Sequence, residues 1–174
     1  MKEPKYLIET TFTKEAYKKF LYAATLKKNK LMWLYIVLIS VIGALIIGYN
    51  GLDLDIQRFV ISGLSFFILI ILVLIIKIEV KYSQRMKSDN TGSFGSVTTL
   101  KFYDNKVFEE NEFLKSSGEI KYNQFYTLVE TKDLFVFYIT ANQASLISKS
   151  DITTNYDEFR AFIIAKFKGK YKKI

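Results

Sequence analysis

The chain of 174 residues contains neither cysteine nor histidine. The missing cysteine excludes disulfide bonds, thiolate chemistry and cysteine metal sites, and the missing histidine removes a common metal ligand and general base. Two long apolar runs, residues 31–49 and 59–76, also lack acidic and basic side chains. Transporters and proton relays need such side chains inside the bilayer. The sequence therefore predicts no catalytic residues, no cofactor and no metal site.

The two apolar runs predict a transmembrane helical hairpin. As helices that rise 1.5 Å per residue, they each reach roughly 27 Å, close to the roughly 30 Å hydrocarbon core of a bilayer. The connection, residues 50–58, is too short for anything but a tight turn, so the spans must be antiparallel neighbours. We therefore expect spans over 31–49 and 59–78 and an outer loop over 50–58.

Positive charge flanks both spans on the side away from this loop. Residues 1–30 carry eight Lys against three Glu, and four basic residues lie within 77–87. The loop itself holds two Asp and one Arg. Because positive charge beside a span is retained on the cytoplasmic side, both termini are predicted to be cytoplasmic.

The first segment, residues 1–30, predicts a short strand and a basic amphipathic helix. The strand is expected over 6–12, and the helix over 14–28 with Thr13 as its N-cap. This helix can either grip anionic headgroups or pack on the soluble domain. Both interpretations stay open at this point.

The chain after the hairpin predicts a linker and a small soluble domain. Residues 79–95 continue the second helix and then break it with Ser, Gly and Asn. Within 96–174, short β-rich segments precede an amphipathic helix with Asn155 as N-cap and Glu158 completing a capping box. The strands are expected over 97–103, 107–110, 113–116, 120–130, 134–140 and 144–148.

This element order defines the expected fold class. It is an α+β membrane protein, in which a transmembrane helical hairpin carries a small cytoplasmic antiparallel β-meander and a C-terminal helix. The apolar stripe of that helix can bury itself against one face or one open end of a bent sheet. The outline is similar to that of a pleckstrin-homology (PH) domain.

Besides the hairpin, five segments carry a recognisable pattern, namely residues 12–17, 122–125, 129–133, 146–149 and 157–163. In this order along one chain they resemble the YcxB-like membrane proteins of bacteria. Two residues depart from the family pattern, since a tryptophan is usual in place of Tyr122 and a proline in place of Ser148. The resemblance implies a multi-pass protein of the bacterial plasma membrane, and a topology rather than an activity. We expect Tyr122, Phe125 and Lys149 to be structural positions.

Lysines near the predicted membrane are candidate contacts for anionic lipid headgroups. Each lysine close to an anionic leaflet contributes on the order of 1 kcal/mol. The alternative is a solvated, frayed tail. The candidates are Lys27, Lys28 and Lys30 before the first span and Lys166, Lys168, Lys170, Lys172 and Lys173 at the C-terminus.

One face of the first span carries only small residues: Ser40, Gly43, Ala44 and Gly48. Small residues allow helices to approach closely. This face either packs within the hairpin, against the second span, or associates with a second copy or a partner's helix.

Two further clusters favour plain structural interpretations. Glu109, Glu110 and Glu112 form an acidic cluster that we expect to face water at a strand edge or turn. Residues 92–95 (Gly-Ser-Phe-Gly) lack the lysine and hydroxyl of a phosphate loop and predict a linker.

Three functional hypotheses follow. The first is a membrane-anchored, non-enzymatic protein whose cytoplasmic domain binds a protein partner or anionic lipid headgroups. The second is a self-immunity factor that blocks a membrane-active bacteriocin or toxin through the hairpin. The third is an enzyme or transporter subunit acting on lipids, which needs an acid/base pair or a groove that the sequence does not display. A homo-oligomer is a candidate assembly, and the chain has no recognised nucleic-acid-binding module.

Overall fold

The computed structural model describes residues 3–28, 30–90, 92–153 and 155–174. It is an α+β structure with antiparallel β-sheets and two long apolar helices. The chain forms two compact units. The sheet domain combines the N-terminal residues up to Ala23 with Met86–Ile174, and the hairpin unit comprises Ala24–Arg85.

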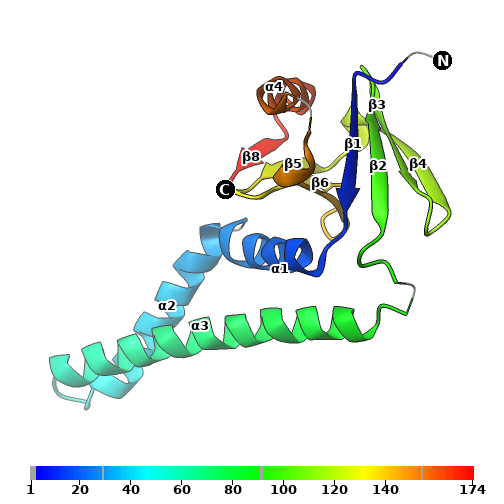
Figure 1. Cartoon of the computed structure of the whole chain (residues 1–174). Helices are drawn as coiled ribbons and strands as arrows, with labels where there is room; N and C mark the ends of the chain where they lie inside the picture. Colours follow the sequence, from blue (N-terminus) through cyan, green and yellow to red (C-terminus); the bar gives the residue numbers. More distant parts are fainter. Residues whose placement is uncertain (1–2, 29, 91, 154) are drawn as a thin grey trace. The chain divides into compact units, whose positions relative to one another are not determined.

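The first sheet of the sheet domain contains four antiparallel strands in the order β1-β2-β3-β4. β1 pairs with β2 over its whole length, although the entire hairpin unit lies between them in the chain (Figure 1). The sequence predicts β1 as part of a separate N-terminal segment, but pairing satisfies its backbone and buries Ile8 and Thr10. The strands are β1 (Tyr6–Thr11), β2 (Val97–Phe102), β3 (Lys106–Asn111) and β4 (Ser116–Lys121).

The second sheet has the strand order β7-β6-β5-β8, with β8 parallel to β5 and the other pairs antiparallel. Every residue of β5 and β6 is buried. Successive side chains point to opposite faces of a sheet, so both faces must be covered. The strands are β5 (Thr127–Glu130), β6 (Leu134–Tyr138), β7 (Ala144–Ser148) and β8 (Tyr171–Lys173).

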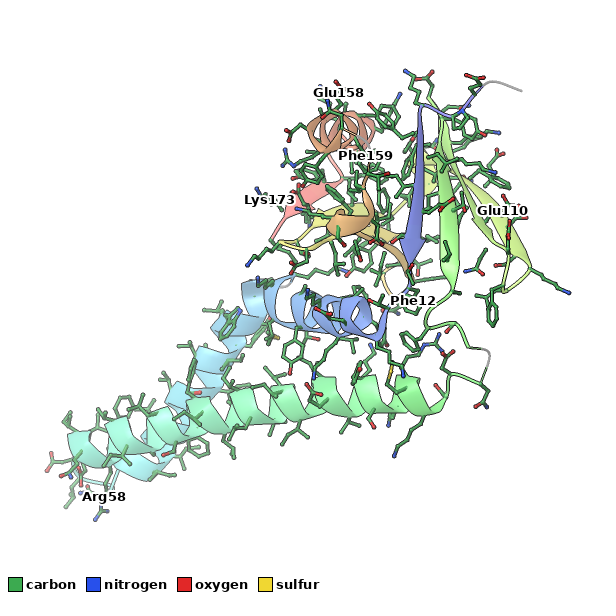
Figure 2. The ribbon with its side chains drawn as sticks, viewed as in Figure 1. Phe12, Arg58, Glu110, Glu158, Phe159 and Lys173 are labelled. Carbon is green, nitrogen blue, oxygen red and sulfur yellow. The ribbon has the colours of Figure 1, made fainter. Side chains whose placement is uncertain are left out.

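Helix α4 (Tyr156–Lys166) contributes to the main core of the sheet domain. Asn155 caps it by accepting a hydrogen bond from the Glu158 N–H, as the sequence predicts. Phe159 and Ile163 are fully buried, and Phe167 follows on the same stripe. Figure 2 shows Phe159 pointing from α4 toward the sheets and Glu158 pointing away from them.

Helix α1 (Lys14–Tyr22) packs on the other face of the second sheet. Thr13 is its N-cap, as predicted, and accepts a hydrogen bond from the Ala16 N–H at 3.0 Å. Ala16 is buried in a second core cluster with residues of β5 and β6, and Phe20 contacts Tyr138. The apolar face of this helix is therefore occupied by the sheet domain.

Two predicted strands differ from the structure. The stretch 113–116, predicted as a strand, is a turn up to Ser116, where β4 begins. The stretch 120–130 is not one strand, because a 3-10 turn at Tyr122–Gln124 separates β4 from β5. The side chain of Gln124 accepts a hydrogen bond from the Lys121 N–H at 2.8 Å and closes this turn.

The hairpin unit contains the two apolar helices, α2 (Lys30–Gly48) and the greater part of α3 (Ile56–Lys87). Both are long and apolar enough to cross a membrane, which suggests membrane association. Only 22% of the candidate span in α2 and 6% of that in α3 is buried within the protein. The helix α3 continues well beyond residue 78, as the sequence predicts.

Candidate functional site

Three of the segments that carry the family resemblance converge on the carboxylate of Glu130. This residue ends β5 and is 1% exposed. Lys149 Nζ donates to Oε1 at 2.7 Å, and Arg160 Nε lies 3.1 and 3.0 Å from the two carboxylate oxygens. The Tyr171 hydroxyl donates to Oε2 at 2.5 Å. We call these four residues the Glu130 cluster.

The Glu130 cluster satisfies a buried charge. Burial alone would raise the pKa of Glu130, but hydrogen bonds from Arg160, Lys149 and Tyr171 outweigh it and lower the pKa to about 2. Arg160 also donates to the Tyr171 hydroxyl at 3.1 Å, and the Lys149 ammonium lies 5.1 Å from the centre of the Phe135 ring. The carboxylate is therefore ionised at neutral pH, and its oxygens are occupied by protein donors.

The cluster joins four separate elements of the sheet domain. Glu130 lies on β5, Lys149 begins the turn after β7, Arg160 lies on α4 and Tyr171 begins β8. Sequence reasoning placed Lys149 as a structural position but did not connect it with the other three residues. No local signal could have found the cluster, because its members lie 19 to 41 residues from Glu130 in the chain.

The lysines predicted to contact lipid differ in their surroundings: some are bound within the sheet domain and others are exposed. Lys166 Nζ lies 3.6 Å from an Asp104 oxygen, and Lys170 Nζ donates to the Asn123 and Phe125 carbonyl oxygens at 2.8 Å each. Both side chains are therefore engaged within the sheet domain. Lys168, Lys172 and Lys173 are exposed.

The C-terminal residues form an ordered strand. In β8, Lys172 pairs with Val129 and Lys173 with Glu130. Before the first span, Lys27 is exposed and Lys28 is half-buried. Lys30 begins α2, but its side chain lies outside the part of the chain that the structure describes.

The small-residue face of α2 packs against α3 within the hairpin unit. A Cβ atom at Gly43 would lie 2.7 Å from the Phe66 ring, and one at Gly48 would lie 2.9 Å from the Phe59 Cβ. Ala44 is 1% exposed. Ser40 is buried as well, and its hydroxyl donates to the Ile36 carbonyl oxygen at 2.8 Å. In the structure this face therefore packs within the hairpin, against the second apolar helix.

The acidic cluster of β3 divides between the two faces of the first sheet. Glu110 points outward and pairs with Lys101 at 3.0 Å, and Glu112 is exposed. The prediction that all three carboxylates face water is wrong for Glu109, whose side chain lies beside core residues such as Val107 and Phe137. Burial raises the pKa of Glu109, because the alternation of side chains along β3 turns it inward.

The outer face of the first sheet carries a groove of about 620 Å³. Its aromatic side chains have lysines beside them, with the Lys101 ammonium 5.6 Å from the Phe108 ring centre and that of Lys106 5.7 Å from the Tyr103 ring centre. Lys106 also pairs with Glu119 at 2.6 Å. The other lining residues are Glu3, Lys5, Asp104 and Asn105.

The groove has a balanced charge. It contains three lysines and three acidic side chains around the two rings. Such a surface suits a mixed polar and apolar polypeptide better than a polyanion. Among the residues that the structure describes, no group of three or more acidic side chains is placed to hold a metal ion.

Residues 102–163 match the family model described as YcxB-like protein. The matched stretch runs from the last residue of β2 into α4 and contains three members of the Glu130 cluster. The resemblance inferred from the sequence segments is therefore confirmed over these residues. No curated protein matches the chain, and neither does any solved structure.

Proposed function

We propose, from the premise that the chain carries a YcxB-like domain over residues 102–163, that it is a membrane-anchored, non-enzymatic protein. Its sheet domain binds a protein partner or anionic lipid headgroups on the cytoplasmic side of a bacterial plasma membrane. The observation that carries this proposal is the place of the apolar hairpin in the chain. It occupies the connection between β1 and β2, which are paired neighbours in one sheet.

The topology supports a PH-like domain. Strands β1 to β4 form one sheet in chain order, β5 to β7 follow in a second sheet, and α4 completes the core. β1 and β7 meet where the sheets approach, and the Thr10 hydroxyl donates to Asp151 at 2.7 Å just after β7. A domain with the hairpin inserted between its first two strands is tethered to the membrane by both ends of that hairpin.

The two ligand classes correspond to different surfaces of the sheet domain. The groove on the first sheet, with its two rings and balanced charge, supports a protein partner. The exposed Lys168, Lys172 and Lys173 support contact with anionic headgroups. We favour the protein partner, because the groove combines concave shape, aromatic surface and polar groups of both signs.

Topology can be tested with single cysteines in this cysteine-free chain. Asp53 and Ser150 are both exposed, so D53C and S150C are accessible to a membrane-impermeant thiol reagent once they face it. In intact cells we expect D53C to react and S150C to react only after the membrane is permeabilised. The reverse pattern would refute the cytoplasmic placement of the sheet domain.

Partner binding can be tested with a photoreactive amino acid at Tyr103 in the groove. We expect discrete protein adducts after illumination of membranes, and no such adducts from the same substitution at Tyr126, which is 57% exposed and does not line the groove. Adducts with lipid alone at Tyr103, or identical protein adducts at both sites, would contradict a partner that docks in the groove.

Lipid binding by the C-terminal lysines has to be tested by substitution, because removing these residues would also remove β8 and Tyr171. The control must remove the same number of positive charges elsewhere. We suggest K172Q/K173Q with K14Q/K121Q as the control, because all four lysines are exposed. The whole protein in neutral nanodiscs is mixed with phosphatidylglycerol vesicles. Headgroup binding through the C-terminus predicts that only K172Q/K173Q loses vesicle binding; equal binding by both variants excludes it.

A further inference from the structure

Three of the exposed apolar side chains of the sheet domain lie at one end of the first sheet. Val97 begins β2, and Phe113 and Leu114 lie in the turn between β3 and β4. Their exposed fractions are 47%, 64% and 40%. In the register of the sheet, Val97 pairs with the last residue of β1, and the turn lies beyond the last β3–β4 pair at the same end.

The turn that presents Phe113 and Leu114 is held in one conformation. The Leu114 N–H donates to Asn111 Oδ1 at 2.9 Å, and the Lys115 N–H donates to the Glu112 carbonyl oxygen at 3.2 Å. The amide of Asn111 is itself fixed by the hydroxyls of Ser96 and Thr98, at 3.0 and 2.9 Å. The turn is thus supported by side chains from two strands.

Lys115 has a φ of 48°, and among the described residues it is the one non-glycine residue with positive φ. A lysine in this region costs on the order of 1 kcal/mol relative to glycine. Backbone strain of this kind persists where the surrounding structure imposes it, and often at functional positions. The turn thus holds two apolar side chains in water at a cost in backbone strain, and this exposure is itself unfavourable unless something covers them.

The tip lies beside the segment through which the chain arrives from α3. A Cβ atom at Gly92 would lie 3.3 Å from the Phe113 ring, and Gly92 has a φ of +65°. Glycine therefore fits this position both by backbone conformation and by the space that the ring leaves. Only residues 88–91 separate Gly92 from the last residue of α3, so the chain joins the tip closely to the end of that helix.

We propose that Phe113 and Leu114 insert into the interfacial layer of the membrane that α2 and α3 cross, with Lys115 at the headgroups. The inference rests on the anchoring proposed above. An aromatic and a leucine side chain beside a lysine match the interface, where apolar groups enter the acyl boundary and the ammonium remains hydrated. Because the exposed Glu112 offsets the charge of Lys115, insertion depends on the apolar side chains and only weakly on salt.

The test uses tryptophan fluorescence of the whole chain in liposomes. The single natural tryptophan, Trp33, lies in α2 and is first replaced in a W33F background. F113W in this background is compared with Y126W, an exposed aromatic position outside the tip. Insertion should shift the emission of F113W to the blue, and lipids brominated near the headgroups should quench it, whereas the emission of Y126W should be quenched only by aqueous iodide. These responses should persist at high salt.

Three results would overturn the inference. Emission of F113W that iodide quenches as strongly as that of Y126W would leave the tip in water. Emission of F113W that neither iodide nor brominated lipid quenches would mean that protein covers the tip. If iodide quenching then returned on dilution into excess lipid, the covering protein would be a second copy of the chain. Trp33 in the natural chain reports anchoring separately. Quenching of Trp33 by lipid brominated near the headgroups, where the first span begins, without a response of F113W refutes tip insertion alone, and no quenching of Trp33 refutes the anchor as well.

Discussion

At the scale of single residues, Glu130 and Glu109 show how neighbours decide the state of a carboxyl group turned toward the interior of one domain. Glu130 is almost fully buried, yet its pKa is lowered because three donors converge on it. Glu109 also faces inward, and burial raises its pKa. Removal of one partner from a buried ion pair leaves an uncompensated charge, which is the costly case.

The first prediction concerns E130Q. The glutamine leaves Lys149 and Arg160 without their counter-ion, so we expect the free energy of unfolding of the sheet domain to fall by about 3 to 5 kcal/mol. E110Q is the matched control, since Glu110 also pairs with a lysine but at a half-exposed position, and should cost about 1 kcal/mol or less. Denaturant unfolding of the purified protein in detergent measures both. Equal losses would show that the Glu130 cluster contributes no more than a surface pair.

A second prediction concerns pH. The pKa of Glu130 is about 2 in the folded protein and near its ordinary value of 4.5 in the unfolded chain. A carboxyl group with a lowered folded pKa stabilises the fold above its unfolded pKa and loses this contribution as the pH falls through the folded value. Stability should therefore fall between about pH 4.5 and pH 2. In E130Q this part of the pH dependence should be absent, and an unchanged profile would contradict the assignment.

At the scale of elements, short distances between backbones determine how the two apolar helices meet. Gly43 and Gly48 leave room for the Phe66 ring and for Phe59, and Gly63 faces Ala44. Small side chains let helices approach closely in a membrane, where hydrophobic burial provides no drive for association. The small residues of α2 fit a dimer equally well by sequence alone. Their packing against α3 is therefore seen only in the folded hairpin.

The third prediction uses this proximity. A Cβ atom at Gly63 would lie 3.3 Å from the Ala44 Cβ, close to the roughly 3.5 to 4.5 Å of disulfides. We expect A44C/G63C to form a disulfide within one chain upon mild oxidation, seen as a monomer with altered mobility on non-reducing gels. The single variant I46C, at a 74% exposed position of α2, is the control for random collision. A disulfide-linked dimer of A44C/G63C would instead indicate that this face joins two copies.

At the scale of the whole molecule, an apolar helical hairpin interrupts a domain that is continuous in space but divided in sequence. β1 and β2 pair from Tyr6↔Phe102 to Thr11↔Val97 across the insertion. α1 and β1 precede the hairpin, yet both contribute core residues, namely Ala16 and Ile8. The N-terminal residues thus belong to the core of the sheet domain and also lead into the apolar helices.

The fourth prediction separates these two roles. Replacing residues 24–87 by a flexible Gly/Ser linker should leave a water-soluble, cooperatively folded sheet domain, because both strands and α1 remain. The same protein without residues 3–12 should be unstable or aggregate, since β2 becomes an unpaired edge and Ile8 leaves the core. Circular dichroism and thermal unfolding measure both. A stable fold without residues 3–12 would show that β1 is dispensable.

Local patterns predicted much of this protein correctly. The absence of charge in two long runs was sufficient to locate α2 and α3, because helix length and hydropathy are properties of contiguous residues. The caps Thr13 and Asn155 were also predictable, since capping depends on residues three positions apart. Strand boundaries around Phe113 and Tyr122 were not, because turns there close through side chains such as Asn111 and Gln124.

By itself, then, the sequence determined that the chain has two apolar helices, a β-rich C-terminal part and a capped last helix. Only the tertiary structure decided that β1 completes the sheet that begins again after the hairpin, and that Glu130 collects Lys149, Arg160 and Tyr171. The physical reason is distance along the chain. Hydropathy and capping act between neighbours, whereas strand pairing and the neutralisation of a buried charge depend on groups that meet only when the chain has folded.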